Sequence, residues 1–345
     1  MPGDAISSYT LKLRDIFRSW GYESELFAPS PHIDRSRRRV CRPLTDLRVP
    51  EAGSLLIYHF SIASPATAAF QEAAGKKIII YHNITPAKYF YVFNPRMAAL
   101  LKEGRRELYE LRSTAELALS DSEYNQRELM EAGFPRTAVI PLSPNLSFSE
   151  ARPDRRLLFR YRGGGPNLLF VGRIAPNKKF EDLIKVFYYF KKTLQPDARL
   201  FLVGNAAGNE NYLSYLKALI KRLDLPGVIF PGHHLASKLH AYYHLGDVFL
   251  CLSEHEGFCL PLLEAMHAGL PVLAYAGAAV PETLRGAGIL IREKNYPEIA
   301  ELANLLVTDH NLRERVLSGQ KDRLREFQAI SLADRLKSEL GPWLE

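Results

Sequence analysis

Short apolar runs alternate with longer amphipathic stretches along the whole chain. Residues 55–58, 77–81 and 117–120 have the composition of buried strands, and similar runs follow in the second half at 167–171, 200–203, 228–230, 248–252 and 272–275. Apolar residues recur at helical spacing between these runs, for example over residues 180–194. Strands that alternate with helices form βαβ units and parallel sheets. The pattern therefore predicts an α/β protein.

Chain length divides this α/β pattern into two domains. The chain has 345 residues, whereas one typical core takes roughly 100 to 150. A stretch rich in proline, arginine and glycine over residues 141–166 is typical of a linker. We expect an N-terminal domain over residues 1–162 and a second, doubly wound domain over 163–327. Leucines at helical spacing in residues 328–345 predict a last helix that crosses back to the first domain.

Charge and cysteine content bear on partners and location. The net charge is +7, and residues 1–164 hold 24 lysines and arginines against 18 aspartates and glutamates. Solvated loop and helix faces are the simpler explanation, and contact with anionic lipid head groups is the alternative. The three cysteines have no C-x-x-C spacing, and no apolar run reaches the roughly 20 residues that span a bilayer. We expect a cytoplasmic protein, with peripheral contact to the inner face of a membrane as an option, and no nucleic acid partner.

The segment 253–264 directly follows the predicted strand at 248–252 and carries two carboxylates, Glu256 and Glu264. In an open parallel sheet, ligands bind beyond the carboxyl ends of the strands. Gly257 lets the backbone approach a ligand closely, and Pro261 suits the first turn of a following helix. The start of that helix is suited to a phosphate because its N–H groups are free and its dipole is positive there. These N–H groups belong to Phe258, Cys259 and Leu260.

Three further segments place polar groups at the ends of predicted strands. After the strand at 167–171, Gly172 and Arg173 lead into a loop that contains Lys178. A guanidinium fork and an ammonium group can neutralise the charge that grows on a diphosphate leaving group. His82 follows the strand at 77–81, and a glycine-bearing loop at 277–282 follows the strand at 272–275. We therefore expect all four segments at ligand-binding edges of parallel sheets.

Together, these segments resemble the retaining family 4 glycosyltransferases of the GT-B fold. The matching motifs are V-G-R at 171–173 with Lys178, the E-x₇-E pair Glu256 and Glu264, and a G-x-x-P-E-like loop at 277–282. The resemblance is strong over about residues 165–325 and looser in the first half. It implies two Rossmann-like doubly wound domains that face a central cleft, an acceptor-side domain over residues 1–162 and a nucleotide-sugar-binding domain over residues 163–327. It also implies a transferase that needs neither a metal ion nor another cofactor.

The resemblance assigns roles to the charged residues of these motifs. Arg173 and Lys178 would bind the donor diphosphate and stabilise it as it departs. Glu256 would hold the transferred sugar, and Glu264 would hold the ribose. His82 would contact the sugar near its reacting carbon. The departing phosphate would itself take the acceptor proton, so the resemblance calls for no protein base.

Further donor contacts follow from the same resemblance. Gly172 and the turn at 257–260 would line the donor, and His233 would lie near the nucleotide base. Gly3 would approach the phosphates, although only Met1 and Pro2 precede it here, so the strand that normally leads into such a glycine is either missing or lies upstream of this sequence. A metal site at His240 and His244 is disfavoured because no carboxylate or cysteine lies close to them in sequence.

The implied reaction is transfer of a hexose from a nucleotide diphospho-sugar with retention of the anomeric configuration. UDP-glucose is the favoured donor, and GDP-mannose is left open. The acceptor would be a saccharide or a lipid-linked saccharide in exopolysaccharide or envelope assembly. Two alternatives keep the fold. A nucleotide-sugar 2-epimerase would resemble these motifs poorly, and the intact basic and acidic residues argue against a catalytically silent partner subunit.

Overall fold

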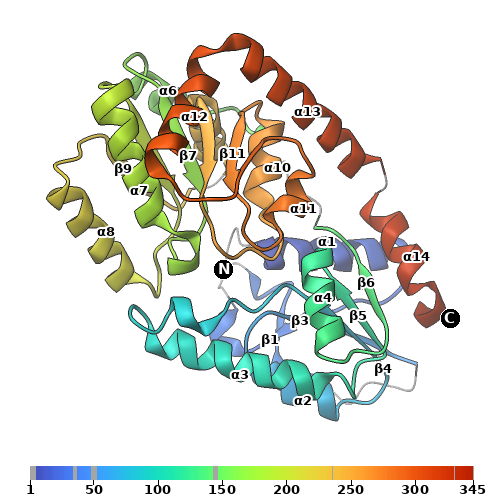
Figure 1. Cartoon of the computed structure of the whole chain (residues 1–345). Helices are drawn as coiled ribbons and strands as arrows, with labels where there is room; N and C mark the ends of the chain where they lie inside the picture. The colour runs from blue at the N-terminus through green and yellow to red at the C-terminus, as the bar shows by residue number, and fades with distance from the viewer. Residues whose placement is uncertain are drawn as a thin grey trace. The chain divides into compact units, whose positions relative to one another are not determined.

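The computed structural model of the chain forms two compact units (Figure 1). It describes residues 5–33, 37–47, 53–142, 147–234, 236–329 and 331–344. The first unit comprises Met1–Pro86, Ala99–Ser143 and Ile330–Glu345, and the second comprises Ala87–Ala98 and Pro144–Ala329. Each unit contains one larger sheet of parallel strands together with helices. The predicted α/β class is confirmed.

The larger sheet of the first unit has the strand order β3-β4-β5-β6. These strands span Leu55–Phe60, Lys76–Tyr81, Leu117–Ser120 and Thr137–Val139. The apolar runs predicted the first three, whereas β6 is short and only half-buried, so its pattern is weak. A separate parallel pair joins β1 (Phe27–Ala28) to β2 (Arg42–Pro43).

Four helices belong largely to this unit: α1 (Ala5–Ser19), α2 (Ala66–Glu72), α3 (Pro95–Leu111) and α4 (Glu123–Glu131). Helix α4 begins at Glu123, directly after Ser122, whose side chain accepts a hydrogen bond from the backbone N–H of Asn125. Such a cap satisfies one of the N–H groups left free at a helix start. It thereby fixes the turn that follows β5.

The sheet of the second unit has the strand order β12-β11-β10-β7-β8-β9. In chain order, the strands are β7 (Asn167–Val171), β8 (Arg199–Val203), β9 (Val228–Gly232), β10 (Val248–Cys251), β11 (Val272–Tyr275) and β12 (Ile289–Ile291). All but β12 were predicted. The direction of strand addition reverses between β7 and β10, which are hydrogen-bonded neighbours. Such a reversal opens a crevice at the carboxyl ends of the two strands, where ligands bind in open α/β sheets.

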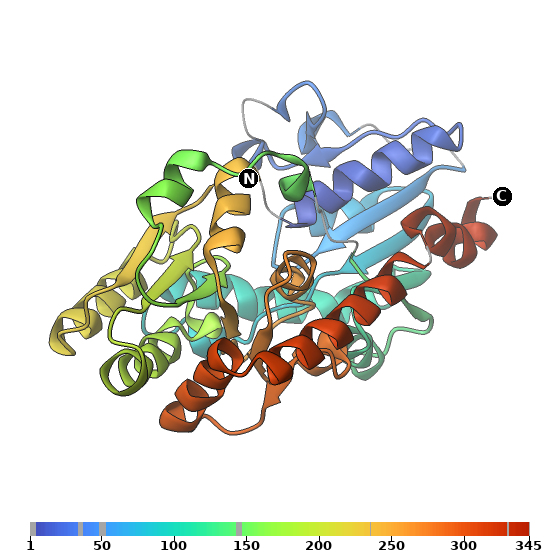
Figure 2. The same ribbon diagram turned by 90° about the horizontal axis from the view of Figure 1, so that it is seen from above.

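Helices connect these strands: α7 (Phe180–Tyr189), α8 (Glu210–Arg222), α9 (Ala236–Leu245), α10 (Leu260–His267), α11 (Val280–Leu284), α12 (Tyr296–Thr308) and α13 (His310–Gln328). The predicted helix over 180–194 is confirmed, with its last turn, Phe190–Leu194, widened to a π-helix. Helix α13 lies alongside α10 and α12 (Figure 2). Two short helices, α5 (Ser147–Glu150) and α6 (Arg155–Arg160), lie where a linker was expected, and both pack on α9.

The last helix, α14 (Leu332–Leu344), packs on the first unit. Its buried face consists of Leu332, Leu336 and Leu340, the leucines that predicted it. The Tyr22 hydroxyl donates a hydrogen bond to the Leu344 carbonyl at 3.0 Å. Among the described residues, no helix combines the length and the apolar character that crossing a membrane requires.

Candidate active site

The loops after β7 and β10 are joined by hydrogen bonds at the point where the strand order reverses. The side-chain amide of Asn177 donates to the His255 carbonyl at 3.0 Å. The backbone N–H of Glu254 donates to the Asn177 carbonyl, also at 3.0 Å. Asn177 and His255 are buried, so these bonds are shielded from water. The two segments predicted to carry the chemistry therefore lie side by side.

Lys178 and Glu256 form an ion pair across this junction. The Glu256 side chain is 6% exposed and that of Lys178 is 21% exposed. Burial lowers the pKa of Lys178, but Glu256 and two nearby cysteines raise it more, and the net pKa lies above its usual value. The other carboxylate oxygen of Glu256, Oε1, is buried and has no hydrogen-bond partner within the described part of the chain. An unpartnered buried oxygen is costly, which marks Oε1 as an atom that awaits a donor group.

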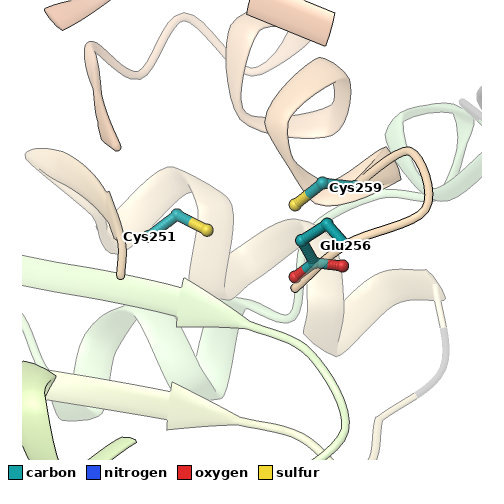
Figure 3. Close-up of side chains that lie close together, drawn as sticks. All are labelled: Cys251, Glu256 and Cys259. Atoms are coloured by element: carbon teal, nitrogen blue, oxygen red, sulfur yellow. The ribbon is translucent and has the colours of Figure 1, made fainter. Parts of the chain in front are cut away.

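The two cysteines beside Glu256 are Cys251, the last residue of β10, and Cys259, just before α10 (Figure 3). Both are free thiols, and their sulfur atoms and a Glu256 oxygen lie within 4.8 Å of one another. Three such atoms could bind a metal ion, but the ammonium group of Lys178 already faces them. A further cation would be repelled there. The contact between Cys259 and Cys251, together with burial, holds the pKa of Cys259 well above its usual range. Cys259 is therefore not an activated thiol.

Arg173 follows β7 and presents an exposed side chain. Among the described residues, no hydrogen bond or ion pair of its guanidinium group is found. An arginine at a ligand-binding edge with all its donors free is suited to bind a phosphate group in a bidentate manner. The backbone before it is fixed, because the Gly172 N–H donates to the Val203 carbonyl of β8 at 2.9 Å.

Gly204, directly after β8, sets the position of the Arg173 loop. A Cβ atom at Gly204 would lie 1.8 Å from the Gly172 carbonyl oxygen, so one of the two backbones would have to move. We expect Gly204→Ala to lower the free energy of unfolding by about 1–3 kcal/mol, the cost of overpacking. Denaturant unfolding of the purified protein measures this loss.

Gly319 provides the matched control for that substitution. It lies inside α13, and a Cβ atom there would meet nothing within 4 Å. Gly319→Ala should therefore leave stability unchanged or raise it by about 0.5–1 kcal/mol, because alanine favours a helix interior. Equal stability of the two alanine variants would show that Gly204 does not constrain the Arg173 loop.

Glu264 lies in the second turn of α10 and is half-buried. The Tyr243 hydroxyl of α9 donates a hydrogen bond to its Oε2 atom at 2.7 Å. Burial raises the pKa of Glu264, and the bond from Tyr243 opposes this rise only in part. Tyr243 thus fixes one oxygen of the carboxylate, and no partner for Oε1 is found within the described ranges.

The start of α10 is shaped by the loop after β11. Cys259, just before the helix, has a φ of 68°, an unusual value for a residue other than glycine. The Thr283 hydroxyl of α11 donates to the Phe258 carbonyl, and the Ala279 N–H donates to the Glu256 carbonyl at 3.2 Å. In the described structure, the N–H groups of Phe258, Cys259 and Leu260 have no hydrogen-bond partner. These groups are therefore available to an anion.

The structure does not place three of the predicted site residues at this junction. His82 belongs to the first unit, where its buried side chain contacts Asp121 and His59. His233 is exposed after β9, at the edge of the sheet and two strands away from β7. Gly3 lies outside the described residues. The roles proposed for these three residues therefore stay predictions.

Sequence reasoning missed several groups that shape the site, namely Cys251 and Tyr243. It also missed Lys294, whose ammonium group lies 2.8 Å from Asp182 and 2.9 Å from Glu254. This pair of contacts ties the Glu254 loop to helix α7. No local sequence pattern predicts such partners, because each is distant in sequence from the residue that it contacts.

Comparison with known proteins shows which family the loops of this site are similar to. Residues 160–323, which include both loops and helices α7 to α12, match the family described as "Glycosyl transferases group 1". This match covers somewhat less than half of the chain. The motifs at 171–178 and 256–264 lie inside the matched residues, whereas the first unit lies outside them.

Curated relatives of the chain also carry glycosyltransferase names. D-inositol 3-phosphate glycosyltransferase of Stackebrandtia nassauensis is 31% identical over 229 residues, which cover 62% of this chain and 50% of the relative. Sulfoquinovosyl transferase SQD2 of Arabidopsis thaliana is 23% identical over 295 residues, which cover 80% of this chain and 55% of the relative. The chain thus spans about half the length of the curated relatives it matches.

Solved structures establish the fold. HepE of Anabaena, crystallised with UDP and glucose, superposes with a TM-score of 0.65 at 16% identity, covering 99% of this chain and 96% of HepE. Sucrose-phosphate synthase of Thermosynechococcus elongatus superposes with a TM-score of 0.67 at 18% identity, covering 84% of this chain and 73% of that one. The predicted GT-B fold is confirmed.

Proposed function

We propose that this protein is a retaining glycosyltransferase that transfers a hexose, with glucose favoured, from a UDP-sugar to a saccharide or lipid-linked saccharide. The observation that carries the proposal is the group of unsatisfied polar atoms where the strand order reverses. An exposed, unpaired Arg173, the buried Oε1 of Glu256 and free N–H groups at the start of α10 lie at the ends of β7 and β10. HepE, which shares the fold, was crystallised with UDP-glucose.

The basic groups would act on the leaving diphosphate. Its negative charge grows as the bond between sugar and phosphate breaks, and preorganised cations stabilise that charge without reorganising water. Arg173 would supply a fork of donors and Lys178 a point charge. Lys178 is already held in place by Glu256, so little side-chain entropy is lost when the donor binds. The resemblance noted above then implies that the departing phosphate takes the acceptor proton.

The carboxylates would orient the two sugars of the donor. Oε1 of Glu256 would accept a hydrogen bond from a hydroxyl of the hexose, and Oε1 of Glu264 one from the ribose. Each carboxylate has its other oxygen fixed by a protein group, Lys178 or Tyr243. A carboxylate with one oxygen held by the protein is well suited to bind a sugar hydroxyl, because its other oxygen cannot rotate freely.

A panel of radiolabelled UDP- and GDP-sugars tests the proposal. A transferase should hydrolyse its donor slowly when no acceptor is present and release the free sugar. A 2-epimerase would instead return an epimer of the nucleotide-sugar, and a silent subunit would return the donor unchanged. Either of these two results would overturn the proposal.

Glu264→Gln should weaken donor binding in the same preparation. A hydrogen bond to a charged group contributes about 1.5–3 kcal/mol, so we expect roughly 10- to 100-fold lower affinity by calorimetry. The wild-type affinity should also fall as the pH decreases, because a protonated carboxyl is a poorer acceptor. Since burial raises the pKa of Glu264, this fall should begin at a higher pH than for an ordinary glutamate.

Tyr243→Phe is the matched control for Glu264. It removes the bond to Oε2 but leaves Oε1 and its charge in place.

The effect of Glu264→Gln on the free energy of unfolding separates a structural role of Glu264 from a role in donor binding. A pKa raised by folding means that the ionised carboxylate costs stability, and this cost is relieved as the pH falls through the raised value. Glu264→Gln should thus not destabilise the fold, and unchanged donor affinity would remove Glu264 from the ribose site.

A further inference from the structure

A chain of hydrogen bonds links three side chains at the carboxyl edge of the first unit's sheet. His59 lies near the end of β3, and His82 and Asp121 directly follow the neighbouring strands β4 and β5. The Nδ1 atom of His82 lies 2.8 Å from Oδ2 of Asp121. The Nε2 atom of His82 lies 2.9 Å from Nδ1 of His59. Both ring nitrogens of His82 are engaged, so the chain ends at His59.

The ring geometry supports a directed hydrogen bond between the histidines. Their planes differ by 2°, and their centroids lie 5.2 Å apart. With nitrogen atoms 2.9 Å apart, this separation places the rings edge to edge in one plane, along the lone-pair direction. Tyr9 of α1 packs perpendicular to both rings, at centroid distances of 6.0 and 5.9 Å. Packing and hydrogen bonds together therefore fix both rings.

The chain of bonds selects the position of each proton. A carboxylate only accepts hydrogen bonds, so Asp121 accepts from the Nδ1–H of His82. Nε2 of a neutral His82 is then unprotonated and accepts from the Nδ1–H of His59. A neutral His59 consequently carries its lone pair on Nε2. Burial and the neighbouring His82 lower the pKa of His59 well below its usual range, which favours the neutral ring.

The outer nitrogen of His59 is the end of this chain of hydrogen bonds. Within the described part of the chain, no hydrogen bond of His59 Nε2 is found. The His59 residue is half-buried, so part of its surface is exposed to solvent. A buried polar atom usually has a hydrogen-bond partner. The fixed chain thus ends in an acceptor without a described partner, at the edge of a parallel sheet, where ligands bind.

We propose that the Nε2 atom of His59 accepts a hydrogen bond from a sugar hydroxyl, while His82 and Asp121 act as positioning residues that fix its tautomer. This inference rests on the proposed function. The hydroxyl belongs either to the hexose of the donor or to the acceptor saccharide, and both offer the same chemistry. The proposal transfers the role of direct sugar contact from His82, whose side chain is 2% exposed, to His59.

Two-bond proton–nitrogen spectra of histidine-labelled protein test the tautomer without any turnover. When both rings are neutral, we expect His82 and His59 to carry their protons on Nδ1. The groups that face the pair are Asp121, Tyr9 and each other. Asp121→Asn introduces a group that can also donate, so it should shift protons toward Nε2 of both rings. Protonation of His59 Nε2 in the wild-type protein at neutral pH would overturn the proposal.

His59→Asn tests the ligand contact. The asparagine amide can still donate to His82 from the position of Nδ1, but the outer nitrogen is lost. Affinity for UDP should stay at the wild-type value. If the hydroxyl is the donor's, affinity for UDP-glucose should fall on the order of tenfold, the cost of one lost hydrogen bond. If it is the acceptor's, donor affinity should persist and the transfer rate should fall by a similar factor.

The same substitution at an exposed histidine, His310→Asn at the start of α13, is the control and should change neither quantity. If the wild type turns over a nucleotide-sugar and His59→Asn matches it in both affinity and transfer rate, the inference is wrong and the proposed function stands. If the wild type neither binds nor turns over any nucleotide-sugar, the proposed function fails, and the ligand contact of His59 fails with it.

Discussion

Lys178→Met is expected to lower the free energy of unfolding by about 3–5 kcal/mol, the cost of leaving one partner of a buried ion pair alone. Glu256 would lose its ion-pair partner, and its side chain is only 6% exposed and lies beside two thiols. Methionine matches the length of the lysine stem, so the loss would come from charge rather than volume. Urea unfolding followed by fluorescence measures the change.

The double variant Lys178→Met/Glu256→Gln separates the ion pair from simple packing. Removing both charges should recover a large part of the lost stability, because no unpaired charge stays buried. Donor turnover should stay low in both variants, since the proposed leaving-group cation is absent from each. The stability losses of the single variants Lys178→Met and Glu256→Gln are the reference. If the loss in the double variant equals the sum of these two losses, the two charges do not interact, and the ion pair has no structural role.

Much of the fold could be predicted because parallel strands that are buried on both faces read as apolar runs. β5, β7 and β11 match their predicted bounds, and the other predicted strands differ by one or two residues. The weaker strands β6 and β12 have three residues each: β6 is only half-buried, and the apolar run Ile289–Ile291 of β12 is too short to indicate a strand by itself. Element type follows from local pattern, whereas short elements are set by the sheet they join.

The site could be predicted only at the level of its segments. Glycine, arginine and glutamate at strand ends pointed to the loops after β7 and β10, and strand order then brought these loops together. The partners of each group could not be read in the same way. Lys178 meets a residue 78 positions away, and Tyr243 meets one 21 positions away. Such contacts follow from tertiary packing, which a single sequence does not encode in any local period.

For His82 too, the sequence predicts the position of the residue but not its contacts. Its place after β4 was predicted, but its neighbours lie on β3 and after β5, so its orientation depended on the order of three strands. A strand-end histidine can point to a ligand or to the sheet beside it. Here Asp121 contacts Nδ1 of His82 and His59 contacts Nε2, so both ring nitrogens of His82 have partners within the first unit. The functional reading of a single residue thus required its partners.

Arg173→Ala is expected to reduce turnover by about 10²- to 10³-fold, the usual loss when one preorganised transition-state donor is removed. Stability should not change, because in the described structure this guanidinium group has no bond to lose. The affinity for UDP should fall less than the rate, since charge on the phosphate grows as the bond breaks. Single-turnover rates and calorimetry with UDP measure the two effects separately.

Two further variants serve as controls for the Arg173→Ala prediction. Arg173→Lys keeps the charge but loses the planar fork, so it should recover only part of the rate if two phosphate oxygens are bound at once. Arg222→Ala removes an exposed arginine from α8 and should leave turnover unchanged. A rate for Arg173→Ala close to that of Arg222→Ala would exclude Arg173 from the mechanism. The leaving group would then depend on Lys178 and the N–H groups at the start of α10, and Lys178→Met would have to account for the whole effect.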